Sequence, residues 1–313
     1  MVRSRFATFF AVWEASDSVV FVTTSTAQAL PIPSSPSTAP LRAPAPIIKW
    51  VGGKGRLMSQ LRPLLPPGVD LMRHVEPFVG GGAMFFERRP ERAMLCDINP
   101  QLVNVYTQVR DDVDGVIGHL RKLAAGHSKE HYYEVRTSYN APAKPAAPQR
   151  AAMFIYLNKT CFNGLHRVNR KGEFNVPAGR YDKPRILDED LLRSASHQLA
   201  GTDIRCTGFE SLLSTAKPGD FIYLDPPYEP VSRTASFTAY AQDGFAQADQ
   251  TRLRDVFSAL HKRRCRLMLS NSDVPFIREL YGKFKINVVA AGRAINSNAS
   301  KRGPVPEVVV RNY

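Results

Sequence analysis

The sequence predicts an α/β fold built on a mainly parallel sheet, with a largely helical segment inserted into it. Apolar runs with strand character alternate with stretches of helical apolar spacing, which is typical of parallel strands joined by crossover helices. Residues 110–185, between these units, are mostly helical in pattern and become strongly basic. The strand-like runs are 73–78, 92–98, 221–224, 266–270, "KINVVAA" and "PEVVVRNY", and the helical stretches are 100–110 and 249–263.

Composition indicates a soluble protein that binds a polyanion. The chain has 313 residues, 43% of them hydrophobic and 22% charged, enough for one large domain or two modest ones. Lys and Arg outnumber Asp and Glu by 42 to 28, giving a net charge of +14. This surplus favours nucleic acid or an acidic membrane surface as a partner. No apolar run approaches the ~20 residues of a membrane-spanning helix.

The beginning of the chain differs from the rest. "PIPSSPSTAPLRAPAP" lacks periodicity and predicts a disordered leader, rich in Pro, Ser and Ala, over residues 1–45. "MVRSRFATFFAVW" faintly resembles a secretory signal, but Glu14 and Asp17 interrupt the apolar stretch. A dispensable extension, or a start codon assigned too far upstream, is therefore favoured over export.

The cysteines argue against a metal centre. None of Cys96, Cys161, Cys206 and Cys265 belongs to a CxxC pair, and no histidine sits at zinc-finger spacing. We therefore expect no metal. Scattered cysteines also fit a reducing compartment, so the expected location is the cytoplasm.

A glycine loop follows the first predicted strand. In "EPFVGGGAMFF", glycines from Gly80 onward allow a tight turn and a close approach of the backbone to a ligand. Phe85 stands where a dinucleotide motif has its third glycine, which disfavours a dinucleotide. Asp97 ends the second strand 17 residues after Gly80, near the ~20-residue distance at which an acid holds a ribose. Together they predict a site for an adenosine-containing cofactor, while a structural turn with an N-cap aspartate stays the alternative.

Two further stretches are candidate binding elements. "KWVGGK" at 49–54 places Trp50 to pack on a ring and Lys54 to meet a carboxylate, although the stretch could equally be a surface turn. "IYLDPPYEP" at 222–230 ends a buried strand at Asp225, because the next two prolines offer no N–H to a sheet ladder. A carboxylate, free carbonyls and Tyr228 at the carboxyl end of a strand could hold a flat, hydrogen-bonding molecule. A strand-ending turn with a packed tyrosine is the alternative.

The basic segment from Asn158 to Arg185 indicates contact with nucleic acid. It holds seven Lys and Arg against two acids, interleaved with Phe162, Phe174, Tyr181 and four asparagines. Basic groups neutralise phosphates, whereas aromatic rings and amides stack on bases or bond to their edges. A solvated charge run would have little use for Phe, Asn and Gly at this density.

In this order, the motifs resemble those of the Dam-type N6-adenine DNA methyltransferases. They are Lys-Trp-Val-Gly-Gly-Lys, Glu-Pro-Phe-Val-Gly-Gly-Gly, Asp-Ile-Asn-Pro, Asn-Gly-Leu-x-Arg with Gly-Glu-Phe-Asn-Val-Pro, and Asp-Pro-Pro-Tyr. "LSNSD" (269–273) and "RAINSN" (293–298) also resemble that family's closing segments, and the resemblance covers roughly residues 47–313. Two departures are the third loop glycine, Gly82, and Ala178, where relatives often carry an aromatic residue in a DNA-contacting loop.

The resemblance implies a Rossmann-like S-adenosylmethionine-dependent methyltransferase sheet with an inserted, mainly helical DNA-recognition domain. The catalytic domain would comprise residues 46–110 and 186–313, and the target-recognition domain residues 111–185. Site residues follow in three groups: Asp225, Pro226 and Tyr228 for catalysis; Trp50, Lys54, Phe78, Gly80, Asp97 and Asp225 for the cofactor; Lys49, Asn163, Leu165, Arg167, Asn175, Pro177, Arg180 and Tyr181 for DNA.

The expected reaction is methyl transfer to N6 of adenine in double-stranded DNA. This amine is a poor nucleophile, so Asp225 and the Pro226 carbonyl are expected to accept its hydrogens and aim its lone pair at the methyl group, with Tyr228 stacked on the ring. The base must first flip out of the duplex. Phe237 and Tyr240 are candidates for lining the pocket, with core packing as the alternative for each.

Arginine and apolar side chains in the basic block favour GATC as the target, and a longer site that contains GAT, as in enzymes of similar pattern, is the alternative. In Dam-type enzymes the arginine matching Arg167 reads the last guanine, those matching Leu165 and Pro177 touch the third base pair, and the lysine matching Lys49 contacts the first guanine. An RNA amino-methyltransferase and a methylation-incompetent DNA-binding regulator are the alternatives. A nucleoid-associated enzyme, with or without a cognate restriction endonuclease, is compatible with the resemblance.

Overall fold

The computed structural model describes residues 42–231, 245–291 and 305–313. The strands are β1 His74–Glu76, β2 Ala93–Asp97, β3 Asp203–Cys206, β4 Phe221–Leu224, β5 Arg266–Ser272, β6 Lys285–Ala291 and β7 Val305–Arg311. The helices are α1 Met58–Leu61, α2 Ala83–Arg88, α3 Pro100–Asp111, α4 Val113–Ala125, α5 Lys129–Asn140, α6 Ala147–Thr160, α7 Glu189–Leu199, α8 Leu212–Thr215, α10 Gln247–Lys262 and α11 Pro275–Leu280.

Within these described ranges, the strands form one sheet in the order β3-β2-β1-β4-β5-β7-β6. Neighbours from β3 to β5 run parallel, whereas β7 is antiparallel to both β5 and β6. The prediction of a mainly parallel sheet is confirmed. Because the chain turns back from β3 to β4, the order reverses between β1 and β4, and ligands bind at the carboxyl ends of strands at such a switch point.

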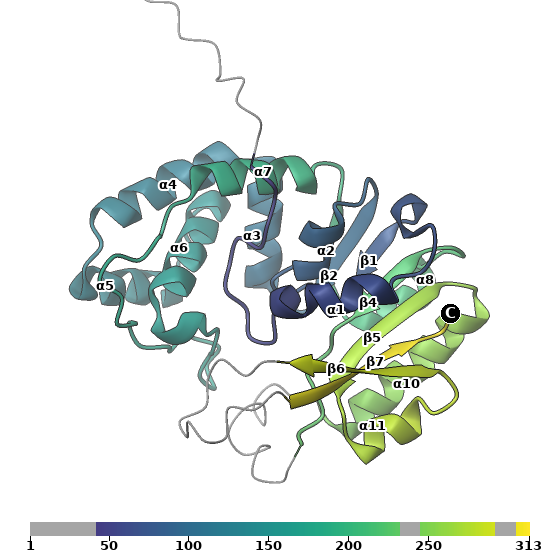
Figure 1. Ribbon diagram of the computed structural model, residues 1–313. Helices are drawn as coiled ribbons and strands as arrows, with labels where there is room; N and C mark the ends of the chain where they lie inside the picture. Colours follow the sequence, from purple (N-terminus) through teal and green to yellow (C-terminus); the bar gives the residue numbers. More distant parts are fainter. Residues whose placement is uncertain (1–41, 232–244, 292–304) are drawn as a thin grey trace, which may run out of the picture. The chain divides into compact units, whose positions relative to one another are not determined.

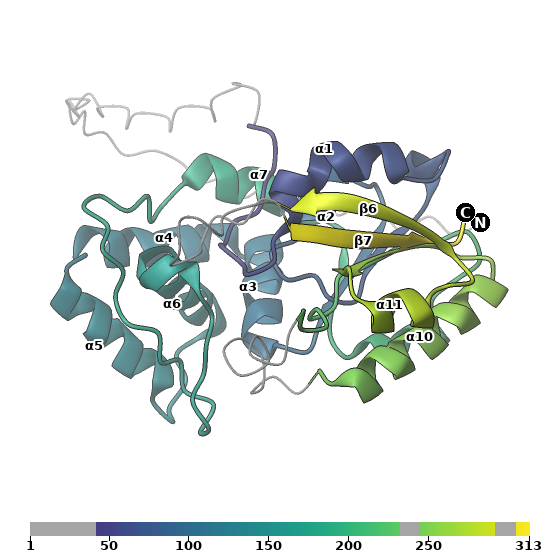
Figure 2. The same cartoon turned by 60° about the horizontal axis from the view of Figure 1, so that its bottom comes forward.

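Helices cover both faces of the sheet because side chains alternate along each strand. On β4, Ile222 and Leu224 belong to a core cluster that includes residues of α8, α10 and α11. Phe221 and Tyr223 face the opposite way and pack with residues of α1 and α2. Figure 1 shows α10 and α11 below β5 and β7, and Figure 2 turns β6 and β7 toward the viewer. The carboxyl ends of β1 and β4, at the switch point, are therefore supported by core packing on both faces of the sheet.

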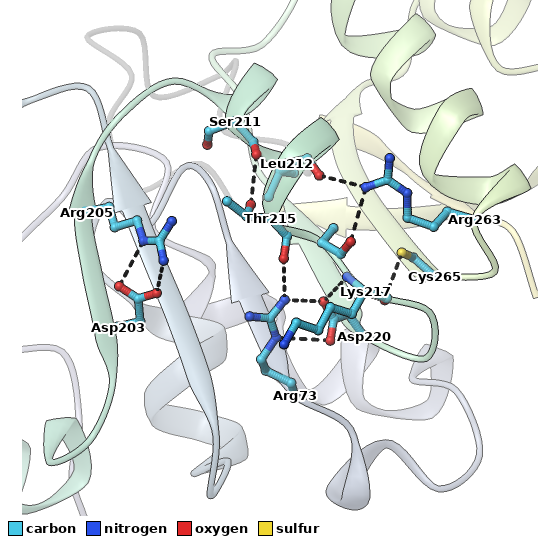
Figure 3. Close-up of polar contacts among 11 residues, drawn as sticks. Arg73, Asp203, Arg205, Ser211, Leu212, Thr215, Lys217, Asp220, Arg263 and Cys265 are labelled. Atoms are coloured by element: carbon cyan, nitrogen blue, oxygen red, sulfur yellow. Dashed lines mark hydrogen bonds and ion pairs between the residues drawn. The ribbon is translucent and has the colours of Figure 1, made fainter.

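The switch strands are also fixed at their amino ends. The Arg73 guanidinium, just before β1, donates to both carboxylate oxygens of Asp220, just before β4, and to the Thr215 carbonyl (Figure 3). In the same view Arg205 of β3 pairs with Asp203, and Arg263 donates to the Leu212 and Ala216 carbonyls. These contacts fix β1 and β4 relative to each other, so the loops at their carboxyl ends start from fixed positions.

Residues 113–160 form α4, α5 and α6, which continue from α3 without an intervening strand. Their apolar faces share one large core with α3 and α7, including Val116, Leu120, Tyr132, Ile155 and Leu199, all buried. Figure 1 shows α4 to α6 grouped on the side of α3 away from β4 and β5. The segment expected to recognise DNA is therefore helical over much of its length and packed onto the sheet domain through α3.

Residues 42–45, which we expected to belong to the disordered leader, lie on the folded unit. Arg42 Nη1 is 2.9 Å from the Asp188 carboxylate, and Ala45 packs against the helical core. Within the described ranges, no helix is long and apolar enough to cross a membrane.

Candidate active site and DNA-binding surface

The glycine loop after β1 is joined to the end of β2. Gly80 N donates to Asp97 Oδ2 at 3.2 Å, and Asn99 N donates to Asp97 Oδ1 at 2.9 Å. The Tyr106 hydroxyl of α3 donates to the Gly80 carbonyl at 2.8 Å. Burial raises the pKa of Asp97, and the backbone donors oppose that effect. The structure thus brings together the two features, loop glycine and strand-end acid, from which the sequence predicted a cofactor site.

Trp50 covers this loop. A Cβ atom at Gly80, where φ is +47°, would lie 2.7 Å from Trp50 Cδ1, and one at Gly81 would lie 3.2 Å from Trp50 Cβ. Glycine is therefore required at Gly80 both for its backbone conformation and for the approach of the indole. Trp50 also stacks on His166, with ring centroids 5.5 Å apart. The tryptophan consequently contacts both the glycine loop and the basic segment.

Asp225 follows β4 directly and forms an ion pair with Lys54. Lys54 Nζ lies 2.8 Å from Asp225 Oδ1 and donates to the Gly52 carbonyl at 2.6 Å. The side chains are 5% and 20% exposed for Lys54 and Asp225. Burial raises the pKa of Asp225, while the Lys54 ammonium acts in the opposite direction. The carboxylate is therefore partly accessible and held by a cation from another motif.

Tyr228 closes the other side of this ion pair. Its ring centroid lies 4.7 Å from Lys54 Nζ, and its hydroxyl donates to Glu307 Oε2 of β7 at 2.8 Å. Pro226 is buried. Tyr228 is thus fixed at both ends, by a cation under its ring and a carboxylate at its hydroxyl.

Buried amides behind the Asp-Pro-Pro-Tyr loop hold its backbone. Gln250 Nε2 donates to the Pro227 carbonyl at 2.9 Å, and Asn271 Oδ1 accepts from Glu229 N at 3.1 Å. The two amides are joined by a bond from Asn271 Nδ2 to Gln250 Oε1 at 3.1 Å, and both are fully buried. They satisfy the Pro227 carbonyl and the Glu229 N–H beyond the end of β4, and so hold the loop after Asp225 in place.

A buried polar chain lies at the carboxyl end of β1. Arg88 Nη1 is 2.8 Å from His74 Nδ1, and His74 Nε2 is 2.6 Å from Glu76 Oε1. Because arginine only donates, Nδ1 accepts and Nε2 carries the proton that His74 donates to Glu76. Burial lowers the pKa of His74 and, together with the Asp225 charge, raises that of Glu76. This chain holds the first residue of the glycine-loop motif.

Phe78 lies in an aromatic cluster. It stacks on Phe209 with ring centroids 5.6 Å apart and meets the edge of Phe245 at 5.9 Å. Ile98, directly after Asp97, is 72% exposed. Reasoning from the sequence did not single out Ile98, although an apolar residue beside the predicted ribose acid was a possible signal.

Lys49 and the basic segment come together although they are more than a hundred residues apart. Buried Asn158 of α6 accepts from Lys49 N and donates to the Lys49 carbonyl, both at 2.8 Å, and also donates to the Gly164 carbonyl at 3.1 Å. Lys49 Nζ donates to the Tyr181 hydroxyl at 3.2 Å. A Cβ at Gly164, where φ is +64°, would lie 2.4 Å from Lys49 Cδ. The predicted DNA contacts Lys49 and Tyr181 are therefore neighbours.

The rest of the predicted DNA-binding set lies on the loops after α6. Phe162 N donates to the Pro177 carbonyl, and Gly179 N donates to the Thr160 carbonyl. Residues 160–162 and 177–179 therefore lie side by side, joined by backbone hydrogen bonds. Asn163 has φ of +55° and is exposed, as is Phe162 at 48%. The remaining members are half-buried Leu165 and Asn175 and exposed Arg167, Pro177 and Arg180. Phe162 is a further candidate that the sequence reasoning counted only among the aromatics of the segment.

Some predicted residues lie outside the described ranges. Phe237 and Tyr240 fall within residues 232–244, and the "RAINSN" segment falls within 292–304. Within the part of the chain that the structure describes, no group of three or more His, Cys, Asp or Glu side chains is placed to hold a metal ion.

A doubly wound sheet with a glycine loop, a strand-end acid and a lysine-paired aspartate at its switch point is typical of the α/β proteins that bind ligands there. The family model of the D12 class N6 adenine-specific DNA methyltransferases matches residues 50–295, and the chain belongs to this family. It is an adenine-specific DNA methyltransferase, as the motifs predicted.

Two kinds of relatives are similar over most of their length. The chain is 41% identical to the type II methyltransferase M1.LlaDCHI of Lactococcus lactis subsp. cremoris, covering 86% of this chain and 95% of the relative. It is also 41% identical to the type II methyltransferase M.MjaIII of Methanocaldococcus jannaschii, over 86% of this chain and 99% of that protein. The DNA adenine methylase of Escherichia coli K12 is 36% identical, over 84% and 93% of the two chains.

Proposed function

We propose that the enzyme transfers a methyl group from S-adenosylmethionine to N6 of a flipped adenine in duplex DNA, within the sequence GATC. The observation that carries this proposal is the partly exposed Asp225 carboxylate, held by Lys54 at the carboxyl end of β4. A carboxylate there can accept a hydrogen bond from an exocyclic amine as positive charge develops on the nitrogen.

The cofactor would lie along the edge formed by the glycine loop and the end of β2. When bound, S-adenosylmethionine supplies an electrophilic methyl group on a sulfonium. Asp97 accepts from the ribose hydroxyls, and Ile98 offers exposed apolar surface to the adenine ring. Trp50 packs over the loop, and Phe78 supports it from the aromatic cluster. Lys54 donates to the Gly52 carbonyl and forms an ion pair with Asp225, and its ammonium charge would also attract the methionine carboxylate.

The target adenine would bind between Asp225 and Tyr228. Asp225 Oδ and the Pro226 carbonyl each accept one N6 hydrogen, which turns the nitrogen lone pair toward the methyl carbon. Bound S-adenosylmethionine would supply the methyl group to N6 and keep the electron pair of the C–S bond on sulfur, while Asp225 and the Pro226 carbonyl hold the amine in place and the extra N6 proton would leave to water. Tyr228 stacks on the base, its orientation fixed by the bond to Glu307. Alignment and polarisation of the amine supply the rate.

A base reaches this pocket only after leaving the helix, which unstacks its neighbours. Exposed Phe162, beside exposed Asn163 in a left-handed conformation, is suited to fill the space left in the duplex. Guanine and thymine edges are recognised by positive charge, paired N–H donors and apolar surface. These are supplied here by Lys49, Arg167, Leu165 and Pro177. The assignment of GATC rests on these residue types, and relatives named DNA adenine methylases support an adenine target.

The deciding experiment is single-molecule sequencing of DNA from a host that expresses the enzyme, with the Asp225→Asn variant as matched control. We expect N6-methyladenine in GATC, absent with the variant. Methylation confined to sites without GATC would refute the target sequence but not the reaction. A transfer assay on RNA and duplex DNA separates the RNA alternative, and transfer to neither would favour a regulator.

A further inference from the structure

Among the residues that the structure describes, Asn175 is the one that binds the side chain of Arg167, the residue proposed to read the last guanine. Arg167 Nε donates to Asn175 Oδ1 at 2.8 Å, and Arg167 Nη2 donates to the Asn175 backbone carbonyl at 3.3 Å. The two residues face each other across a hairpin, because Asn175 N donates to the Arg167 carbonyl at 3.1 Å and Val168 bridges to Phe174. Side chain and main chain of Asn175 thus both bind the same guanidinium.

The turn of this hairpin is internally bonded. Asn169 N donates to the Glu173 carbonyl at 2.9 Å, and Gly172, with φ of +76°, donates to the Asn169 carbonyl at 2.9 Å. The Asn169 side chain accepts from Lys171 N and Glu173 N. Its amide also donates to Glu173 Oε2 at 2.7 Å, which holds the hairpin's own acid at the turn.

The arm that carries Asn175 is anchored on α5. Asn140 donates to the Phe174 carbonyl and accepts from Phe174 N, both at 2.9 Å. The buried Tyr132 hydroxyl donates to the Val176 carbonyl at 2.8 Å. Asn175 therefore stands between two residues whose main chains are fixed, and it is a firm support for an exposed arginine.

The contacts of Asn175 select which edge of the guanidinium stays free. A guanidinium has five N–H groups, and Asn175 takes the one on Nε and one on Nη2. Both N–H groups of Nη1 and one of Nη2 remain free of other described partners. One N–H of Nη1 and the free N–H of Nη2 point in the same direction at the end of the guanidinium. Such a pair matches O6 and N7 of a guanine in the major groove.

The uncharged amide of Asn175 suits this role better than a carboxylate would. Within the described ranges Arg167 has no ion pair with an acid, so its charge is kept for DNA. An aspartate at position 175 would accept the same bond from Nε but neutralise the guanidinium. A side chain held in its binding geometry before DNA arrives also loses less freedom on binding.

We infer that Asn175 is a positioning residue that fixes Arg167 for end-on reading of a guanine, rather than mainly a DNA contact of its own. This inference rests on the proposed role of Arg167 in base reading. It predicts that Asn175 controls discrimination at the same base pair as Arg167, whichever base pair that is.

The test compares methylation of duplexes in which each base pair of the mapped site is changed in turn. We expect Asn175→Ala to lower discrimination at the Arg167 position at least tenfold in kcat/KM, with cofactor affinity and melting temperature unchanged. Asn175→Asp should keep that discrimination while weakening binding to all sequences. Lys171→Ala, at the exposed turn, is the matched control and should weaken binding without changing discrimination.

A double-variant cycle completes the test. In an Arg167→Ala background, Asn175→Ala should cause no further loss of discrimination, since its effect passes through the arginine. Unchanged discrimination in Asn175→Ala, or an equal loss with and without Arg167, would overturn the inference. A mapped site other than GATC would refute the proposed target instead. Discrimination in the double-variant cycle would then be compared at the base pair at which Arg167→Ala lowers it.

Discussion

Replacing Lys54 by methionine removes the only cation that the described residues place against Asp225. Lys54 Nζ is 2.8 Å from Asp225 Oδ1, and the lysine side chain is only 5% exposed. Removing one partner of a buried ion pair costs about 3–5 kcal/mol. Asp225 keeps 20% of its side-chain surface in contact with solvent, so we expect a smaller loss, about 1–3 kcal/mol of unfolding free energy at neutral pH.

The same substitution changes how activity depends on pH. Burial raises the pKa of Asp225, and the Lys54 ammonium opposes that effect. Without the ammonium the pKa rises further. In the proposed mechanism the carboxylate must be ionised to accept from N6, so the acid limb of kcat is expected to move to higher pH. Below that limb, each pH unit reduces the ionised fraction about tenfold.

The sign of the stability change follows from proton binding. With its pKa raised in the folded state, Asp225 takes up a proton at a higher pH in the folded protein than in the unfolded chain. The destabilisation of Lys54→Met is therefore largest above the folded pKa. It shrinks as the pH falls through the folded pKa toward the unfolded value, because the buried carboxyl is then neutral.

Urea unfolding and single-turnover methyl transfer, both measured across pH, provide the assay. The double variant Lys54→Met/Asp225→Asn should recover most of the lost stability but no activity, because no uncompensated charge remains. Lys262→Met, at the exposed end of α10, controls for loss of a positive charge. An acid limb that stays in place in Lys54→Met would refute the assignment of Asp225 as the group that must be ionised.

Three further outcomes are expected. Asp225→Ala should abolish methyl transfer while calorimetry still detects cofactor binding; near-normal turnover would contradict the mechanism. Gln250→Ala leaves the Pro227 carbonyl without its buried donor and should cost about 1–3 kcal/mol of stability and lower kcat more than it raises KM, whereas an unchanged kcat would show that the loop needs no such support. Removing residues 1–41 should leave melting temperature and DNA affinity unchanged, and a large fall in either would show that the leader folds or binds DNA.

Most strands could be predicted from the sequence because they are apolar runs, in the middle of the sheet and also in the edge strand β6. β4, for example, is buried at all four residues. β3, Asp203–Cys206, was missed, because this edge strand is half-buried or exposed throughout and carries two charged side chains in an ion pair. An apolar strand shows its character in its composition, whereas β3 is defined by its pairing with β2, which composition does not record.

The site divides in the same way. The strand end before Asp225 and the tight turn at Gly80 were predictable, because prolines and glycines act on the backbone of their own neighbourhood. Gln250, Asn271 and Glu307 were not, since each acts on a loop 20 or more residues away and belongs to a helix or strand of ordinary composition. The contact between the buried Gln250 amide and the Pro227 carbonyl can be recognised only from the folded structure.

The stretch from Lys49 to Lys54 shows why short motifs can nevertheless locate a site. Lys49 faces Tyr181 in the basic segment, Trp50 covers Gly80 in the glycine loop, and Lys54 pairs with Asp225. Three clusters from distant parts of the chain thus meet one segment of six residues, so its spacing is constrained by all three at once. Trp50 stacks on His166, directly before Arg167. The residue that covers the glycine loop is therefore packed against the segment that carries Arg167, so the proposed cofactor site and the proposed DNA-binding surface both contact Trp50.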